Sequence, residues 1–385
     1  MVRHSSRIEL SQSALKKNIN FIHKKIGQKP RICSVVKANA YGHGTHEFVP
    51  MAEKCGIDYF ATSSSFEAEE VLEVKNEKSD IIIMGILHDE DIDWTLENGI
   101  EFYVFDYNRL ALILQESKKT GKKAKIHLEV ETGTNRTGMN PEDVGKSITF
   151  LKKHSKHFEL IGVCSHLGGA ESFANRFRID RQIKVFNDFK RLFKKRKYLP
   201  KYFHLACSAA ALAWPETILD MVRIGISQYG FWPSPEIYYD HLSKNGKKKD
   251  SPLFRVITWK TNVMDIKQVR KDDFVGYGTA FQAYQDMQIA VLPLGYTNGY
   301  SRNLSNKGFV LIKGKKSPIV GLVNMNLFMV DVSHIKNVVI GDEVVLIGKQ
   351  QNNTITVSSF SSSANLINNE MIARLPAAIP RKPVR

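Results

Sequence analysis

The clearest chemical signal in the sequence is a lysine that closes an apolar run. Lys37 follows the apolar residues 32–36 and precedes a turn that contains Gly42 and Gly44. An ammonium group at a buried strand end loses hydration unless its charge is paired or chemically removed. Desolvation also favours the free amine, which reacts with carbonyl compounds. The position therefore predicts a reactive lysine. The alternative is a strand-end lysine that extends to solvent.

The residues around Lys37 extend this signal to a longer motif. The string VVKANAYGHG, residues 35–44, resembles the cofactor-lysine motif of the alanine racemase family. The resemblance implies that Lys37 holds pyridoxal 5'-phosphate as a Schiff base and is one of two catalytic bases, while the Tyr41 hydroxyl binds the phosphate. Schiff-base formation also removes the charge that burial penalises.

A second group of candidates follows two later apolar runs, residues 202–206 and 221–224. These candidates are Ser208, Gly225 and Ile226. Barrel enzymes often bind phosphate in the loops after their last two strands, and a hydroxyl with exposed backbone amides suits a dianion. Ser208 alone could equally be a helix N-cap. The racemase resemblance covers both segments and implies that these three residues bind the phosphate, with His204 also at a matching position.

Arg223 and His166 have ordinary structural interpretations as well as functional ones. Arg223 could be a salt-bridged strand residue, and His166 a core histidine with a satisfied ring. By resemblance, Arg223 donates to the pyridine nitrogen of the cofactor, and His166 links Arg223 to the catalytic tyrosine. A guanidinium discourages protonation of that nitrogen, which weakens the ring as an electron sink. This favours removal and return of a proton over decarboxylation or transamination.

The catalytic tyrosine implied by the resemblance is Tyr277, in the turn Gly276-Tyr277-Gly278. Such a turn is a weak signal alone, because glycines and aromatic residues often flank β-turns. In the family, this residue is the second base and comes from the neighbouring subunit. Lys37 would remove the α-proton of the D-substrate, and Tyr277 that of the L-substrate. A phenol with an ordinary pKa of ~10 needs a cationic, low-dielectric environment to act near neutrality.

The substrate carboxylate requires a cation, and Arg136 matches the family residue that helps to bind it. The backbone amide of Met325 would assist, again from the partner subunit. Many members orient this arginine with a carbamylated lysine, but the matching residue here is Glu129. We expect Glu129 to replace the carbamate by pairing with Arg136. The alternative is an outward-facing glutamate on an alternating strand.

The elements that position these residues follow an alternating pattern. Eight apolar runs separated by amphipathic stretches predict a (β/α)8 barrel, although six-strand doubly wound folds alternate similarly. Lys37, Arg136, His166, Ser208 and Gly225 fall at or beyond the ends of different runs, where barrel active sites are assembled, which favours the barrel. The predicted strands are residues 32–36, 59–62, 81–86, 101–105, 125–130, 160–164, 202–206 and 221–224.

The sequence changes character in the polar loop 242–252. Closely spaced apolar runs beyond it predict a mostly-β domain, with strands near residues 254–263, 288–294, 308–312, 318–323, 327–332 and 343–347. We therefore predict an N-terminal barrel domain over residues 1–245 and a C-terminal β-rich domain over residues 246–385. A short strand at residues 7–10 and a helix from Ser11 or Ser13 to about Gly27 begin the barrel domain.

Composition narrows the functional classes. The 385 residues are 43% hydrophobic and 24% charged, as in an average globular protein. No run approaches the ~20 apolar residues of a membrane span, and the N-terminus lacks a signal peptide core, so we expect a cytoplasmic protein. Four scattered cysteines indicate neither disulfides nor a metal site. The net charge of +16 raises nucleic acid as a partner, but the basic runs lack interleaved aromatic residues, which favours a solvated basic surface.

The sequence thus predicts a homodimeric racemase that depends on pyridoxal 5'-phosphate, with alanine as the default substrate and D-alanine supplied for peptidoglycan. Serine or a broader amino-acid range stays open. A decarboxylase of the same fold is a second possibility, which Arg223 disfavours. A non-catalytic cofactor carrier is a third, but such relatives resemble the barrel alone and leave residues 254–385 without a purpose.

Overall fold

The structure, a computed structural model, describes residues 4–244, 251–363 and 367–385. The chain forms two compact units. The barrel unit comprises Ser13–Ala38 and Phe48–Phe254, and the sheet unit comprises Met1–Gln12, Asn39–Glu47 and Arg255–Arg385. The predicted boundary between residues 245 and 246 lies outside the described residues, so this division stays a prediction.

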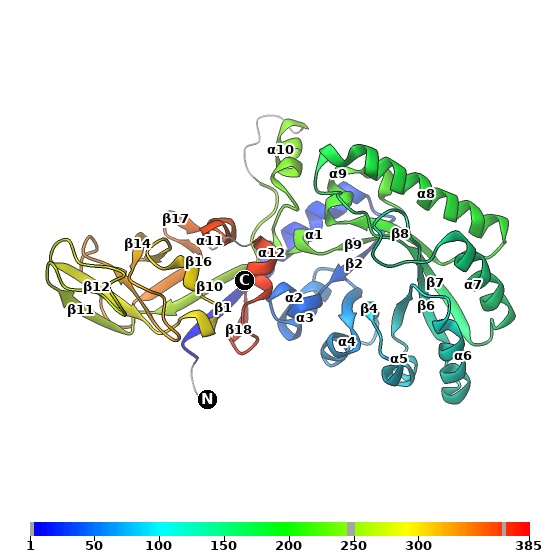
Figure 1. Cartoon of the computed structure of the whole chain (residues 1–385), viewed down its shortest axis with the longest axis horizontal. Helices are drawn as coiled ribbons and strands as arrows, with labels where there is room; N and C mark the ends of the chain where they lie inside the picture. Colours follow the sequence, from blue (N-terminus) through cyan, green and yellow to red (C-terminus); the bar gives the residue numbers. More distant parts are fainter. Residues whose placement is uncertain (1–3, 245–250, 364–366) are drawn as a thin grey trace. The chain divides into compact units, whose positions relative to one another are not determined.

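The barrel unit is built on a closed barrel of eight parallel strands (Figure 1). Two of the strands, β5 and β9, are buried at every residue, because helices cover their outer side and side chains fill the interior. The predicted (β/α)8 barrel is confirmed, and each predicted strand overlaps an observed one. The strands are β2 (Arg31–Val35), β3 (Tyr59–Ser64), β4 (Asp80–Ile86), β5 (Glu101–Val104), β6 (Ala124–Glu129), β7 (Phe158–Cys164), β8 (Tyr202–Cys207) and β9 (Met221–Ile224).

Helices alternate with these strands, and Figure 1 shows α4 to α8 outside the barrel. The apolar stripe of the first helix, at Leu15, Ile19, Ile22 and Ile26, is buried. None of the helices in the described ranges is long and apolar enough to cross a membrane. The α-helices are α1 (Gln12–Ile26), α2 (Lys37–Tyr41), α3 (Thr45–Glu53), α4 (Ser65–Leu72), α5 (Ile92–Glu97), α6 (Arg109–Thr120), α7 (Pro141–Lys153), α8 (Arg176–Lys195), α9 (Ser208–Ala213) and α10 (Pro235–Lys244).

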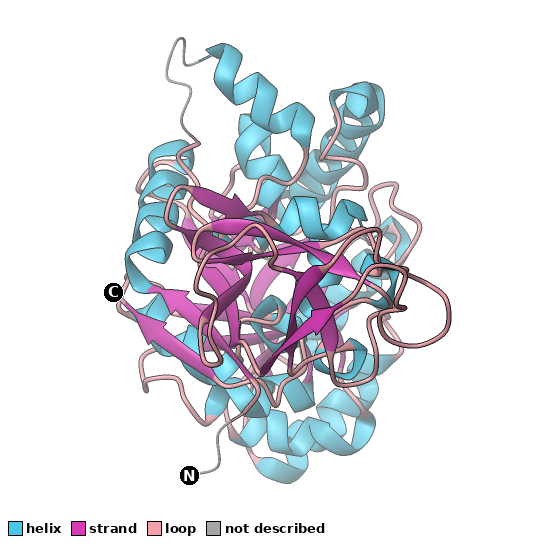
Figure 2. Cartoon of the chain, turned by 90° about the vertical axis from the view of Figure 1, so that its left-hand side faces the viewer, coloured by secondary structure: helices cyan, strands magenta, loops and turns pink. Residues whose placement is uncertain are grey.

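The sheet unit contains a ten-stranded sheet in the order β11-β12-β15-β14-β13-β16-β10-β1-β18, with β17 paired to β16. Figure 2 draws the strands of the chain in magenta and the loops that join its elements in pink. Two short helices, α11 (Val357–Ser363) and α12 (Asn368–Ala373), lie between β17 and β18 in the chain. The strands are β1 (Ser6–Ser11), β10 (Ile257–Asn262), β11 (Asp265–Val269), β12 (Met287–Leu292), β13 (Phe309–Ile312), β14 (Lys315–Val320), β15 (Phe328–Asp331), β16 (Glu343–Gln350), β17 (Asn353–Ile355) and β18 (Arg381–Val384).

The first strand corrects the sequence-based assignment. Residues 7–10 form a strand as predicted, but β1 pairs with β10 and β18 of the sheet unit rather than belonging to the barrel domain. Its residues alternate between buried and half-buried, as in a sheet covered on one face. The alternation predicts a strand but cannot name its partners, which lie about 250 and 370 residues further along the chain.

Candidate active site

The backbone just before Lys37 is held from inside the barrel unit. The Val35 carbonyl ends β2 and accepts hydrogen bonds from the Gln228 side chain at 3.0 Å and the Tyr229 hydroxyl at 2.9 Å. The Lys37 side chain, two residues later, is exposed. Lys37 therefore begins from a fixed strand end while its amine is accessible to a ligand.

The chain after Lys37 adopts an uncommon conformation. The four residues from Ala38 to Tyr41 have φ between 51° and 54°, so α2 is a left-handed turn. For residues with a Cβ, this costs about 1–2 kcal/mol each. Within the sheet unit, the Asn39 side chain accepts from the Thr45 amide at 2.8 Å, and the buried Arg381 donates to the Gly42 carbonyl at 3.0 Å. Strain of this kind persists where surrounding contacts enforce it and is concentrated at functional sites.

Glu67 fixes the start of this turn. One carboxylate oxygen accepts the Ala38 amide at 2.7 Å, and the other accepts the Ser63 amide at 2.6 Å. Glu67 lies three residues after Ser64, the N-cap of α4, whose hydroxyl accepts the Glu67 amide at 3.3 Å. A capping glutamate ordinarily bonds its own N-cap amide. Here the carboxylate instead joins two strand ends and holds the residue next to Lys37.

We expect Glu67→Gln to lower turnover without removing the fold. Glutamine has one acceptor oxygen, so one of the two amides would face an NH2 group, and Lys37 would be displaced. Misplacement of a catalytic group by about 1 Å can cost about 100-fold in rate. Steady-state kinetics on the cofactor-loaded protein measure the effect. Glu69→Gln, at an exposed position of the same helix, is the matched control, and equal turnover in both variants would contradict the role of Glu67.

Arg223 is buried, and most of its N–H groups donate hydrogen bonds to other residues of the barrel unit. Its Nη1 donates to His204 Nδ1 at 2.8 Å and to the His204 carbonyl at 3.1 Å. Its Nη2 donates to the carbonyls of Ser165 at 2.7 Å and Leu205 at 3.1 Å. Guanidinium has five N–H donors, and these bonds use four. Within the part of the chain that the structure describes, the Nε–H has no acceptor, so this donor remains for a ligand.

The candidate phosphate residues lie together at the ends of β8 and β9. The Ser208 hydroxyl accepts the Gly225 amide at 2.9 Å and the Ser227 amide at 3.5 Å. Among the described residues, the Ile226 amide has no acceptor, and the buried Ser227 hydroxyl has no partner. A buried polar group without a partner is costly, so these donors fit a site that a bound anion completes.

His166 lies among several positive charges. Burial lowers its pKa to about 3, assisted by the charges of Arg223, Arg136 and Lys37. These three cations and His166 therefore lie close together at the same end of the barrel. The His166 ring makes no hydrogen bond in the described part of the chain, so its predicted link from Arg223 to a tyrosine stays a prediction.

Because His166 is neutral in the folded protein, we expect the stability of the fold to decrease at acidic pH. An unfolded imidazole gains a proton near pH 6.5, whereas folded His166 gains one only near pH 3. The unfolded state thus binds more protons between these values, and stability falls as the pH falls through this window. Urea unfolding of His166→Gln from about pH 7 to about pH 4 should show a weaker pH dependence than the unsubstituted protein. His88→Gln, at an exposed position, should leave the pH dependence of the unfolding free energy unchanged. If His166→Gln showed the same pH dependence as the unsubstituted protein, the low pKa of His166 would be contradicted.

Glu129 and Arg136 are neighbours without direct pairing. Burial raises the pKa of Glu129, and a hydrogen bond from Thr137 and the charges of Arg223 and Arg136 oppose that rise. Among the described residues, no ion pair joins Glu129 to Arg136, whose side chain is exposed. The predicted pairing is therefore not formed in this structure, because the arginine points into solvent while the carboxylate stays buried.

The remaining candidates belong to the sheet unit. Tyr277 is 71% exposed between Gly276 and Gly278, both with positive φ, so the turn requires glycine on either side. Met325 is 55% exposed, and its amide has no acceptor within the described ranges. Tyr41 is half-buried in the left-handed turn. The Tyr277 and Met325 side chains both face solvent.

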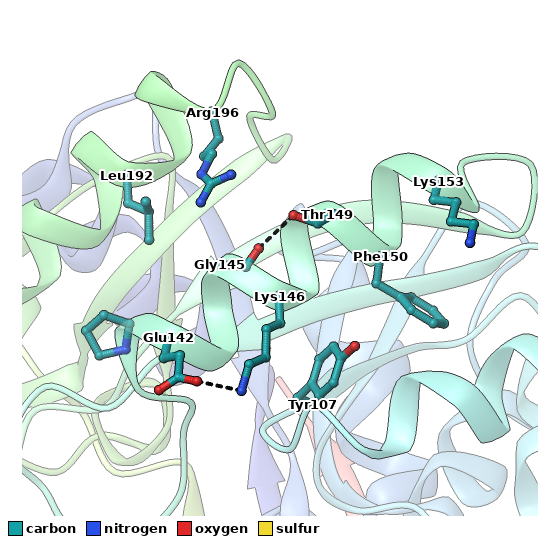
Figure 3. A pocket seen from close by; sticks show the side chains of 10 residues that line it. Tyr107, Glu142, Gly145, Lys146, Thr149, Phe150, Lys153, Leu192 and Arg196 are labelled. Carbon is teal, nitrogen blue, oxygen red and sulfur yellow. Dashed lines mark hydrogen bonds and ion pairs between the residues drawn. The ribbon is translucent and has the colours of Figure 1, made fainter.

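A groove elsewhere on the barrel unit is separate from these residues. It has a volume of about 540 Å³ and lies along α7 and α8, with Tyr107, Phe150, Lys153 and Arg196 in its lining (Figure 3). Lys146 there pairs with Glu142 at 2.7 Å. None of the candidate residues lines it, and nothing in its lining indicates a ligand.

Comparison with known proteins decides the family. A family model for the alanine racemase N-terminal domain matches residues 10–233, and one for the C-terminal domain matches residues 256–383. The chain belongs to the alanine racemase family. Alanine racemase 1 of Caldanaerobacter subterraneus subsp. tengcongensis is 33% identical over 376 residues, covering 98% of this chain and 94% of the relative. The alanine racemase of Methanococcus maripaludis is 32% identical and covers 99% of both chains.

Solved alanine racemases share the fold. The Bacillus anthracis enzyme with bound L-Ala-P has a TM-score of 0.90 and 28% identity, and the match covers 100% of this chain and 96% of that one. The Bartonella henselae enzyme, with covalently bound pyridoxal phosphate, has a TM-score of 0.82 and 24% identity, covering 99% and 100% of the two chains. The likeness to the latter concerns the fold alone.

Proposed function

We propose that the protein is a pyridoxal-phosphate-dependent alanine racemase. Two observations together carry the proposal. Lys37 is accessible and follows a fixed strand end. Arg223 is buried, and its Nε–H lacks an acceptor in the described part of the chain. Lys37 would hold the cofactor, Arg223 would donate to its ring nitrogen, and Ser208, Gly225 and Ile226 would bind the phosphate. Tyr41 would add its hydroxyl.

The bound cofactor would supply an electron-withdrawing ring that acidifies the substrate α-carbon. The chain supplies the bases. Lys37 Nζ would take the α-proton from D-alanine, with a proton returned to the opposite face by Tyr277, and the phenolic oxygen of Tyr277 would take the α-proton from L-alanine, with a proton returned to the opposite face by Lys37. Arg223 cannot accept a proton, so the ring stays a moderate electron sink, which disfavours decarboxylation.

Substrate binding would depend on Arg136 and the Met325 amide, which together suit a carboxylate. Glu129 supplies a permanent carboxylate near Arg136, so we infer that neither carbon dioxide nor a modified lysine is needed. Intact-mass measurement of the active protein is expected to show no added carbamate, and an added carbamate would contradict this inference.

The proposed assembly is a homodimer in which Tyr277 and Met325 of one subunit complete the site of the other. The exposure of both side chains in a single chain supports it. The proposed role is supply of D-alanine for peptidoglycan, and the cytoplasmic location expected from the sequence stays a prediction.

A panel of L-amino acids tests the function. Purified protein with pyridoxal phosphate is expected to produce D-alanine from L-alanine faster than D-serine or longer D-amino acids from their enantiomers, as read by chiral chromatography. Faster turnover of serine would show that serine, not alanine, is the preferred substrate, and the proposed mechanism would stand. Release of carbon dioxide would instead favour the decarboxylase.

A further inference from the structure

A continuous hydrogen-bond chain crosses the barrel interior from Arg223 to Glu101. Arg223 Nη1 lies 2.8 Å from His204 Nδ1, His204 Nε2 lies 2.9 Å from His127 Nδ1, and His127 Nε2 lies 2.6 Å from Glu101 Oε2. All four residues are at most 5% exposed. The Tyr59 hydroxyl donates to the same Glu101 oxygen. The chain links β9 to β5 across the barrel.

Only one arrangement of protons satisfies every contact. Arg223 can only donate, so His204 Nδ1 must be unprotonated. A neutral His204 then carries its proton on Nε2 and donates to His127 Nδ1. His127 must therefore carry its proton on Nε2, which donates to Glu101. A doubly protonated His127 would place two N–H groups against each other at 2.9 Å.

The charges at the two ends fit this assignment. Burial raises the pKa of Glu101, but its interactions with His127 and Tyr59 oppose this and hold the pKa below its ordinary value. Burial lowers the pKa of His204 well below its ordinary value, assisted by the charge of Arg223. A carboxylate and a guanidinium thus end a chain of two neutral rings. Buried charges are tolerated when they are paired and hydrogen-bonded.

We propose that Glu101 and His127 are positioning residues for Arg223. They hold His204 in the tautomer that accepts from the guanidinium, and so fix Arg223 with its Nε–H available. The inference rests on the proposed function only in its last step, in which that Nε–H meets the ring nitrogen of the cofactor. Neither residue needs to touch the cofactor or the substrate.

The first test needs no variant and no cofactor. Nitrogen-15 NMR of the histidine rings in cofactor-free protein is expected to show protonated Nε2 and unprotonated Nδ1 in both His127 and His204, from about pH 6 to about pH 9. A doubly protonated His127, or the opposite tautomer in either ring, would overturn the assignment. Because the measurement is independent of catalysis, absence of racemisation would reject the proposed function without affecting this result.

The second test replaces Glu101 by glutamine. The amide can present its NH2 group to His127, which reverses each proton along the chain and turns a His204 N–H toward Arg223. We expect mixed tautomers in the cofactor-free protein and a fall in kcat of about tenfold with little change in KM, as for other residues that orient a catalytic group. Glu159→Gln, on β7 and exposed, is the matched control.

The two readouts together decide the role of Glu101. Altered tautomers with unchanged kcat, or lowered kcat with unchanged tautomers, would each overturn it. If Glu101→Gln does not fold, His127→Gln interrupts the same chain at its centre. His127→Gln should lower kcat to a similar extent and allow His204 to adopt either tautomer. An unchanged kcat together with an unchanged His204 tautomer would overturn the proposal.

Discussion

Lys37→Ala is expected to abolish racemisation and to remove the absorbance band of the lysine-bound cofactor. The substitution removes both the covalent attachment and the base for the D-substrate. Loss of a residue with two such roles costs roughly three orders of magnitude or more in kcat. The measurement combines chiral analysis of alanine with the absorbance spectrum after cofactor is added and excess is removed.

A control separates this effect from a general loss of charge. Lys54→Ala removes an exposed lysine near the end of α3 and should leave activity and spectrum unchanged. If Lys37→Ala kept the band, another lysine would hold the cofactor. If it lost the band but kept turnover, Lys37 would not be a base.

Tyr277→Phe is the second large effect that we expect. The variant should retain the cofactor band, because Lys37 is intact, but lose proton removal from L-alanine by roughly two to four orders of magnitude, the usual contribution of a general base. The readout is exchange of the α-proton of L-alanine with deuterated solvent. Tyr284→Phe is the matched control, since Tyr284 is similarly exposed at 65% in the same unit.

Mixing two inactive variants tests whether the site is shared. In a mixed dimer of Lys37→Ala and Tyr277→Phe, one site carries neither substitution if the tyrosine comes from the partner. Random exchange of subunits should then restore about a quarter of the full activity, because half the dimers are mixed and each has one intact site. No recovery after subunit exchange would place Tyr277 and Lys37 of the same chain in one site.

The barrel could be predicted because its strands carry their own signal. Residues 221–224, for example, are apolar apart from Arg223 and form β9 in the structure. Pairing between distant segments carries no such signal. The pattern of residues 7–10 predicts a strand, but the strands that pair with β1 lie about 250 and 370 residues further along the chain. β11 (Asp265–Val269) is polar and largely solvent-facing, so no apolar pattern predicts it.

Candidate residues in a compact motif could also be predicted, whereas the residues that hold them in place through hydrogen bonds could not. Lys37 stands in a long recognisable string, but Glu67 reads as a capping residue of α4, and the amide that it holds comes from another strand end. Glu101 is the first residue of β5, and His127 lies within β6. Only closure of the barrel places them on one path to Arg223. Sequence identifies groups that react, and the fold determines which groups hold them.

The most direct test of the account is incubation of the cofactor-loaded protein with L-alanine, and separately with D-alanine, in deuterated water. The account predicts that both reactions reach the same nearly equal mixture of enantiomers, with deuterium at the α-carbon of the product and no release of carbon dioxide. Cofactor bound at Lys37 with neither D-alanine formation nor α-deuterium incorporation would contradict it.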